Sequence, residues 1–417
     1  MKSPWPTKKL GEICKIRTGK KDVDEGNPKG PYPFFTCSRE ITYSDTYSFD
    51  TEAILIAGNG DVGNTKIYKG KFEAYQRTYV LDGFQDNIKY IYYYLIGNLK
   101  KILKKLGSTM PYIRKGDLET FEIPLPPLPI QQKIVKILDT IQSAIEIQEK
   151  IIEKTKELKK SLMNLLFHYG IKGLSIKLLT SYRVSELNSS RVGELKSEEL
   201  EKLGLKLKKT EIGEIPEHWE VVRLGEAYEI TTKPPNFEMK KFELIPFVPM
   251  EEIGFGTTNP KYYMKKMEEI SSGVYFEKGD LLLAKITPSF ENGKQSIVEN
   301  IPLNFGIATT EVIPIKQSSK SSIYYLFYYL QKEDVRNNLA EKMEGTTGRK
   351  RLSKDVLLAF PIPLPPLPEQ QEIAEILQTI DQKIEIEKRK KELYEELFKT
   401  MLNKIMNQEI DIENIEI

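Results

Sequence analysis

The heptapeptide Ile123-Pro-Leu-Pro-Pro-Leu-Pro129 decides how this chain is organised, because residues 362–368 repeat it letter for letter. A Gln-Gln pair follows one residue after each heptapeptide, at Gln131-Gln132 and at Gln370-Gln371. The same offset of 239 positions then persists through five apolar residues, which in the first copy are Ile134, Ile137, Leu138, Ile141 and Ile145. Agreement over such a long interval indicates a duplicated two-part module rather than a solenoid of short repeats.

The repeat also extends toward the N-terminus of each copy. Trp5-Pro-Thr-Lys-Lys-Leu-Gly-Glu12 is similar to Trp219-Glu-Val-Val-Arg-Leu-Gly-Glu226, and Gly107-Ser-Thr109 precedes the first proline run as Gly345-Thr-Thr347 precedes the second. We therefore expect a globular unit, a helix, a second globular unit and a second helix, related by a pseudo-two-fold axis.

Helical spacing begins after each proline run, where apolar residues recur at heptad positions. The predicted seam in the first copy is Ile134, Ile137, Ile141, Ala144, Ile151, Leu158, Leu162 and Leu165, and in the second copy it is Ile373, Leu377, Ile380, Ile384, Tyr394, Phe398, Met401 and Ile405. Pro129 and Pro368 suit the first turn of a helix, where a missing N–H leaves no bond unmade. A long helix with one narrow apolar stripe needs a partner, so we predict that the two helices form an intramolecular coiled coil. The alternative is one long surface helix on each domain.

The globular units are expected to be α+β, with short strands and turn-rich loops. Buried strands are predicted at 53–57 and 280–284, later strands at 77–81 and 310–314, and helices at 90–106 and 322–343. The division that we predict is a first globular domain at 1–127, a long helix at 128–168, a linker at 169–212 with a short helix near 197–203, a second globular domain at 213–365 and a second long helix at 366–417.

Composition excludes several classes of protein. The 417 residues include only two cysteines, Cys14 and Cys37, and two histidines, His168 and His218, which leaves no disulfide scaffold and no Cys/His zinc cluster. No apolar run approaches the roughly 18 residues of a membrane span. The formal net charge is +2 although 29% of residues are charged, so both signs are abundant. We expect a cytoplasmic protein that contacts no membrane.

Catalytic motifs are missing from the sequence. Gly58-Asn-Gly60-Asp-Val-Gly63 has the spacing of a dinucleotide-binding turn, but the residues after it alternate like a strand, so we predict a glycine-rich turn between two strands. The chain has no phosphate-binding loop of the Walker type and no G-x-S-x-G elbow. We therefore predict a chain that is not an enzyme and that binds no metal ion or cofactor.

Basic, polar and aromatic residues instead cluster on predicted loops at matching places of the two copies. In the first copy these are Lys20, Lys21, Asn59, Asn64, Lys66, Gln76, Arg77, Thr78, Tyr112, Arg114 and Lys115. In the second they are Lys285, Thr287, Asn292, Lys294, Thr309, Thr310, Arg349, Lys350 and Arg351. Arg, Asn and Gln can read base edges through paired hydrogen bonds, whereas Lys and Thr hold phosphates. Solvated surface loops would have a similar composition, but a duplicated pattern favours a DNA target with two half-sites.

Several of these motifs together resemble the DNA-specificity (S) subunits of type I restriction–modification systems. The segment Gly213-Glu-Ile-Pro-Glu-His-Trp219 is similar to the start of their target-recognition domains. Ala284-Lys-Ile-Thr-Pro-Ser-Phe-Glu-Asn-Gly-Lys294 with Gly306-Ile-Ala-Thr-Thr-Glu311 is similar to the core of one domain subtype. Gly107-Ser-Thr-Met-Pro-Tyr-Ile113 and the two proline runs match the transition into the helices. The resemblance covers essentially the whole chain.

This resemblance implies two recognition domains that each read one half of a split site in double-stranded DNA. It implies that two antiparallel helices hold the domains apart and dock two methyltransferase (M) subunits, which restriction (R) subunits then join. S-adenosylmethionine, Mg²⁺ and ATP would belong to those partners, and the S subunit would have no activity of its own. Residues 20–70 and 233–293 differ between the copies, so the half-sites are expected to differ. The alternative is a coiled-coil scaffold whose globular ends bind protein.

Overall fold

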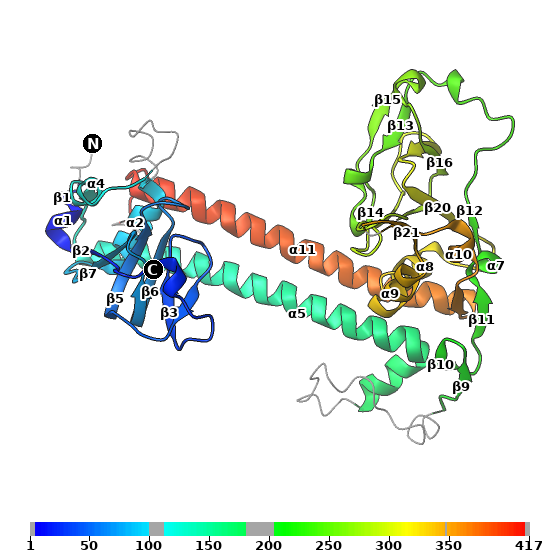
Figure 1. The fold of residues 1–417 in the computed structure, drawn as a ribbon, viewed down its shortest axis with the longest axis horizontal. Coiled ribbons are helices and arrows are strands. Elements are labelled where there is room, and N and C mark those ends of the chain that lie inside the picture. The colour runs from blue at the N-terminus through cyan, green and yellow to red at the C-terminus, as the bar shows by residue number, and fades with distance from the viewer. Residues whose placement is uncertain (1–4, 100–111, 181–203, 347, 413–417) are drawn as a thin grey trace. The chain divides into compact units, whose positions relative to one another are not determined.

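The structure is a computed structural model that describes residues 5–99, 112–180, 204–346 and 348–412. Its contacts divide the chain into two units, one formed by Met1–Lys150 with Glu387–Ile417 and the other by Ile151–Ile386. Each unit contains one globular domain and a stretch of each long helix (Figure 1).

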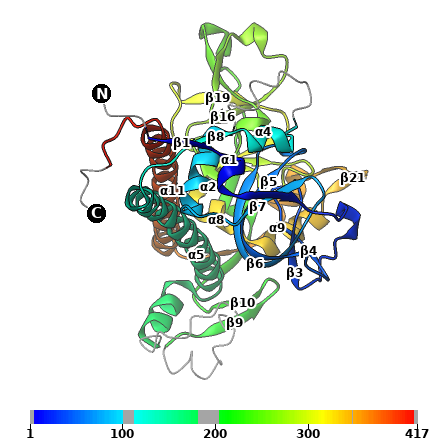
Figure 2. The ribbon, with the colours of Figure 1, turned by 90° about the vertical axis from the view of Figure 1, so that its left-hand side faces the viewer.

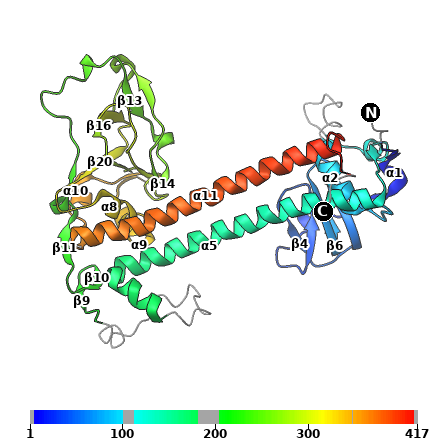
Figure 3. The ribbon, with the colours of Figure 1, turned by 180° about the vertical axis from the view of Figure 1, so that it is seen from behind.

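The two long helices are α5 (Leu128–Thr180), which is interrupted at Gly170, and α11 (Leu367–Met406). Within each unit they lie side by side (Figures 1 and 3). Lys391 of α11 binds Glu149 of α5 at 3.0 Å in the first unit, and Lys159 binds Asp381 at 2.7 Å in the second. Later residues of α5 thus meet earlier residues of α11, which confirms an antiparallel coiled coil within one chain.

The predicted seam of α5 is wrong by one residue over its middle part. Ile152 and Thr155 are buried there, whereas the predicted Ile151 and Leu158 are 37% and 49% exposed. The buried seam includes a polar pair, because Gln148 donates a hydrogen bond to a carboxylate oxygen of Glu387. A pattern based on apolar residues could not detect seam positions occupied by Gln and Thr.

The first domain is built on a six-stranded sheet in the order β2-β7-β5-β6-β3-β4. Helix α2 lies between this sheet and α5 (Figure 2). The elements before α5 are β1 (Thr7–Lys9), α1 (Leu10–Ile13), β2 (Lys15–Thr18), η1 (Val23–Glu25), β3 (Tyr32–Phe35), β4 (Thr42–Ser44), β5 (Phe49–Ala57), β6 (Thr65–Ala74), β7 (Thr78–Asp82), α2 (Ile88–Asn98), α4 (Lys115–Glu119) and β8 (Glu122–Pro124). Residues 53–57 are buried in β5, as the predicted strand requires, and the glycine-rich turn follows directly.

The two larger sheets of the second domain have the orders β12-β20-β17-β18-β14 and β15-β13-β19-β16. Its strands are β9 (Leu207–Thr210), β10 (Gly213–Pro216), β11 (Glu220–Arg223), β12 (Tyr228–Ile230), β13 (Ile245–Val248), β14 (Phe255–Thr258), β15 (Tyr263–Lys265), β16 (Val274–Glu277), β17 (Leu281–Ala284), β18 (Gln295–Ile297), β19 (Phe305–Ala308), β20 (Val312–Gln317), β21 (Glu344–Thr346), β22 (Arg349–Arg351) and β23 (Pro361–Leu364). Its helices are α7 (Leu224–Ala227), α8 (Ile323–Tyr329), α9 (Glu333–Glu341) and α10 (Lys354–Leu358), with 3-10 turns η2 (Met239–Lys241), η3 (Met250–Glu252) and η4 (Met267–Glu269).

Both domains follow one plan. The order β2-β7-β5-β6 of the first matches β12-β20-β17-β18 of the second, and a parallel strand is added to the last strand in each, β3 on β6 and β14 on β18. The strand before the domain core also pairs with the strand before the long helix, β1 with β8 and β11 with β23. The shared plan agrees with the duplication inferred from the proline runs.

Helix boundaries account for most differences from the predicted elements. The helix predicted at 322–343 is two helices, because the chain turns at Gln331, whose N–H donates to the carbonyl of Tyr328, and restarts after Lys332. The helix predicted at 90–106 is α2, and residues 100–106 lie outside the described residues. The short helix near 197–203, the segment Gly107–Thr109 and Thr347 also lie outside them.

Candidate nucleic-acid interface

Three segments of the first domain meet at one corner, which we call the first corner. The N–H of Gly58, just after β5, donates to the carbonyl of Arg77 at 2.9 Å, and the N–H of Ile113, just before α4, donates to the carbonyl of Gly58 at 2.9 Å. These backbone bonds frame a hollow of about 260 Å³. Six predicted DNA-binding residues line it, namely Asn59, Gln76, Arg77, Tyr112, Arg114 and Lys115.

The polar groups at the first corner differ in how firmly they are held. The Nε of Arg114 donates to the Tyr112 hydroxyl at 3.0 Å, and its guanidinium lies 5.0 Å from the centre of the Tyr112 ring. Gln76 donates to Asp22 at 3.1 Å. Arg77 is exposed, and no side chain among the described residues hydrogen-bonds its guanidinium. The first corner therefore presents free donors to solvent.

Other predicted residues of the first domain are held within its loops. Lys21 donates to Ser44 at 2.9 Å and to Thr46 at 2.7 Å, and Thr78 is only 2% exposed. Asn64 and Lys66 both donate to the carbonyl of Ser38, and partial burial lowers the pKa of Lys66. These side chains position the loops, whereas Lys20 is exposed after β2.

A second hollow of the first domain, about 650 Å³, shares Asn59 with the first corner. Arg39, whose side chain is 85% exposed, lies along it and binds Asp61 at 2.8 Å. Arg39 was not predicted from the sequence, because a single arginine in a loop, without a counterpart in the second copy, forms no pattern.

The second domain repeats the backbone of the first corner, and we call this place the second corner. The N–H of Lys285, just after β17, donates to the carbonyl of Glu311 at 3.0 Å, and the N–H of Leu352 donates to the carbonyl of Lys285 at 2.8 Å. Arg351 binds Glu311 at 2.8 Å, and partial burial lowers the pKa of Lys285. Thr310 is exposed next to Glu311.

The remaining predicted residues of the second domain are more scattered. Thr287 donates to Glu291 at 3.3 Å, Lys294 donates to the carbonyl of Met250 at 2.9 Å, and the Thr309 hydroxyl accepts from the backbone of Glu311 at 3.4 Å. Asn292 lines a different hollow, of about 910 Å³, between the domain and α5. On β22, Arg349 is exposed and Lys350 is half-buried.

Two further features of the described part of the chain concern metal ions and membranes. There, no three His, Cys, Asp or Glu side chains gather as a metal site would require, and Cys14 and Cys37 are free thiols. None of the helices in that part combines the length and the apolar character needed to traverse a bilayer.

Comparison with known proteins identifies the family. The family model described as "Type I restriction modification DNA specificity domain" matches residues 2–157 and 216–396. The specificity subunit of type I restriction enzyme EcoDI from Escherichia coli is 31% identical over 375 residues, covering 88% of this chain and 79% of the relative. The MjaVIII specificity subunit from Methanocaldococcus jannaschii is 28% identical over 440 residues, covering 99% and 94%.

A solved structure agrees at the level of the fold. The crystal structure of the type I restriction–modification S subunit from M. genitalium matches with a TM-score of 0.57 and 17% identity, covering 96% of this chain and 95% of that one. A chain from a structural study of complex assembly in the type I system matches with a TM-score of 0.50 and 16% identity. With the family model matched in both copies, the chain belongs to the family of type I restriction–modification DNA specificity subunits.

Proposed function

We propose that this chain reads a bipartite site in double-stranded DNA for a type I restriction–modification enzyme in the cytoplasm, and that it has no catalytic activity of its own. Each globular domain contacts one half-site through its corner. The observation that carries this proposal is the repeated backbone frame, in which Gly58 and Lys285 hold the same hydrogen bonds while the side chains around them differ. One frame with different side chains suits two unlike half-sites.

The long helices set the spacing of the half-sites and dock two M subunits, which R subunits then join. Support comes from apolar side chains that the coiled coil leaves exposed. Ile147 on α5 and Ile386 on α11 occupy equivalent places in the repeat and are 57% and 55% exposed. Leu393 and Leu397 of α11 are also exposed. Apolar groups repeated along a helix face are typical of a surface that another chain covers.

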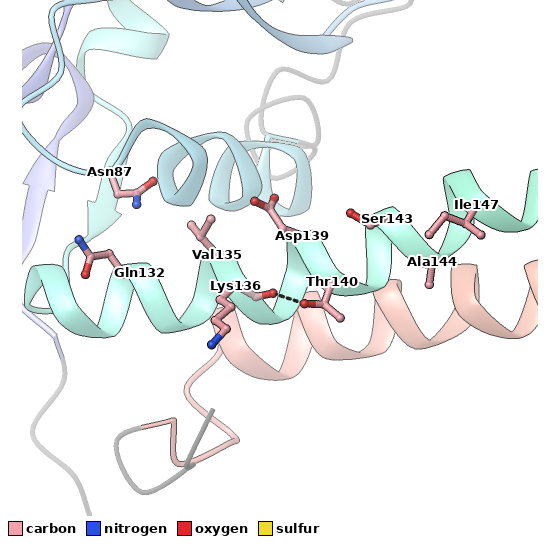
Figure 4. Close-up of a pocket in the computed structure, with 9 residues that line it drawn as sticks. All are labelled: Asn87, Gln132, Val135, Lys136, Asp139, Thr140, Ser143, Ala144 and Ile147. Carbon is pink, nitrogen blue, oxygen red and sulfur yellow. Dashed lines mark hydrogen bonds between the residues drawn. The ribbon is translucent and has the colours of Figure 1, made fainter.

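A groove of about 720 Å³ in the first unit contains one of these residues. It lies along α5 and is lined by Val135, Asp139, Thr140, Ser143 and Ile147, among others (Figure 4). We assign this groove to the docking of an M subunit. S-adenosylmethionine, Mg²⁺ and ATP are then bound by the M and R subunits, not by this chain.

The test is to express the chain with its M subunits and to map methylated adenines across a genome by single-molecule sequencing. We expect a two-part motif that depends on this chain, and binding of the complex to that motif that weakens steeply as salt rises. Methylation that does not depend on the chain would refute the proposal. A scaffold whose globular ends bind protein is not favoured by the family, and it predicts no such motif.

A further inference from the structure

The two corners have different side chains at equivalent positions of the same backbone frame. Arg77 and Glu311 are equivalent, because each accepts the backbone hydrogen bond from the residue that follows the central strand, Gly58 or Lys285. Tyr112 and Arg351 are equivalent as well, because each precedes the residue that donates back to that position. At these two positions the first corner therefore has an arginine on the β7 side and Tyr112 opposite, whereas the second corner has Glu311 on the β20 side and its arginine on β22.

Arg351 is held in place and still accessible. One of its terminal nitrogens donates to Oε1 of Glu311 at 2.8 Å, while its side chain remains 63% exposed. The other oxygen of Glu311 is buried and has no hydrogen-bond partner among the described residues. A guanidinium carries five N–H donors in a planar fork, so the bond to Glu311 leaves a second edge free. The Glu311 carboxylate thus orients the Arg351 guanidinium and leaves some of its N–H donors free.

Neighbouring charges favour this arrangement. Lys285 is close enough for its pKa to respond to both Glu311 and Arg351, and Lys354 adds a further positive charge. Glu311 is the carboxylate that faces these cations, so its removal would leave Arg351 among like charges without a fixed direction. At the first corner no carboxylate of the described residues binds Arg77, and Arg114 with Tyr112 lines the same hollow.

We propose that Arg351, oriented by Glu311, reads a guanine in the half-site of the second domain, and that Arg77 reads a guanine in the half-site of the first. The acceptors O6 and N7 of guanine in the major groove match the paired donors of an arginine. Glu311 is then a positioning residue, a role that the sequence alone did not predict. This inference rests on the proposed function and adds to it the base and the residues that read it.

The experiment uses the full-length chain in complex with its M subunits and maps methylated motifs for single variants. Arg351→Lys and Glu311→Ala are expected to relax the same guanine in one half-site, with preference falling about 10- to 100-fold. A lysine lacks the rigid planar fork of paired donors, and an arginine without Glu311 is no longer oriented. Glu311→Gln is expected to retain the guanine, since its amide oxygen can accept the same bond. Arg77→Lys is expected to relax one guanine in the other half-site only.

The matched control is the exposed pair Arg223–Glu211 in the same unit, at 3.2 Å. Arg223→Lys and Glu211→Ala are expected to leave the motif unchanged, and thermal melting identifies any variant that fails to fold. The inference is overturned if neither half-site contains a guanine that responds, if Arg351→Lys weakens methylation equally at all sequences as a phosphate contact would, or if Glu311→Gln behaves like Glu311→Ala. Failure of the proposed function differs from all of these, because the unaltered chain would then direct no two-part motif.

Discussion

The side-chain oxygen of Gln370, in the first turn of α11, accepts a hydrogen bond of 2.9 Å from the backbone N–H of Ser322, at the start of α8. Its amide nitrogen donates to the carbonyls of Lys320 and Pro365. Gln131 does the same in the first copy, where it accepts from the backbone of Asn87 at 3.0 Å and donates to Pro126. Each globular domain is thus fastened to its long helix by one buried glutamine.

Gln370→Leu is expected to destabilise the second unit by about 2–4 kcal/mol, because it leaves buried backbone groups without partners. Urea denaturation of the full chain measures this change. Gln371→Leu is the control, since the neighbouring Gln371 is exposed and should cost little. Equal stability of the two variants would mean that the buried glutamine does not fasten the domain.

Asp280 predicts a dependence of stability on pH. Burial raises the pKa of this carboxyl to about 6, although the backbone N–H of Glu277 donates to it at 2.7 Å. Because the folded state holds the proton more tightly than the unfolded state, stability falls as pH rises from about 4 to 6 and stays reduced above that range.

Asp280→Asn is therefore expected to stabilise the protein at pH 7.5 by up to about 3 kcal/mol and to have little effect near pH 4. Its amide oxygen can still accept the bond from Glu277. Thermal denaturation at the two pH values measures the difference, with Asp24→Asn on the exposed turn η1 as control. A variant that is less stable at pH 7.5 would contradict the expected sign.

Gly170 is the residue that interrupts α5, with φ at 66°. A Cβ there would collide with a carboxylate oxygen of Glu369 and would approach the Trp219 ring at 3.0 Å. Glu369 also accepts hydrogen bonds from Ile171 at 3.2 Å and from Trp219 at 3.1 Å.

Gly170→Ala is expected to cost about 1–3 kcal/mol, from backbone strain and from displacement of Glu369. Gly116→Ala is the control, because a Cβ at Gly116 meets nothing within 4 Å. If calorimetry gave both variants the same melting temperature, the interruption of α5 would not need glycine.

Lengthening both helices tests the spacing role. Four residues inserted after Lys150 in α5 and four before Glu387 in α11 add about 6 Å of helix. At 3.4 Å per base pair, the preferred spacer should grow by one to two base pairs. Mapping of methylated sites measures the spacer, and an insertion in α5 alone should abolish methylation because the coiled-coil register is lost. An unchanged spacer would contradict this role of the helices.

Docking of the M subunits can be tested at the exposed isoleucines. Ile147→Glu is expected to weaken binding of an M subunit at least tenfold, because a buried charge replaces an apolar contact. Size-exclusion chromatography with light scattering gives the number of M subunits bound. Glu146→Gln on the same exposed turn is the control, and full binding by Ile147→Glu would exclude this face.

The sequence predicted the duplication, the two long helices and the α+β domains because the motifs and apolar patterns that specify them occur in both copies. It placed Ile134 and Leu165 correctly in the seam of α5 but not the middle part, because Gln148 and Thr155, which are buried there, are polar residues. It placed Glu311 in a motif similar to the family's but predicted no role for its side chain, because the hydrogen bond from Arg351, forty residues away, leaves no mark in the sequence. The predicted DNA-binding residues also included Thr78, whose side chain is buried in the fold.

The pairing of β1 with β8, and of β11 with β23, brings the two ends of each globular domain together beside its helix. The chain therefore enters and leaves each domain through two adjacent, paired strands. Recombination at these two strands can replace a whole domain while the rest of the chain remains unchanged. A new specificity can therefore arise by exchange of an intact domain, and it does not require several point mutations in the loops that contact DNA.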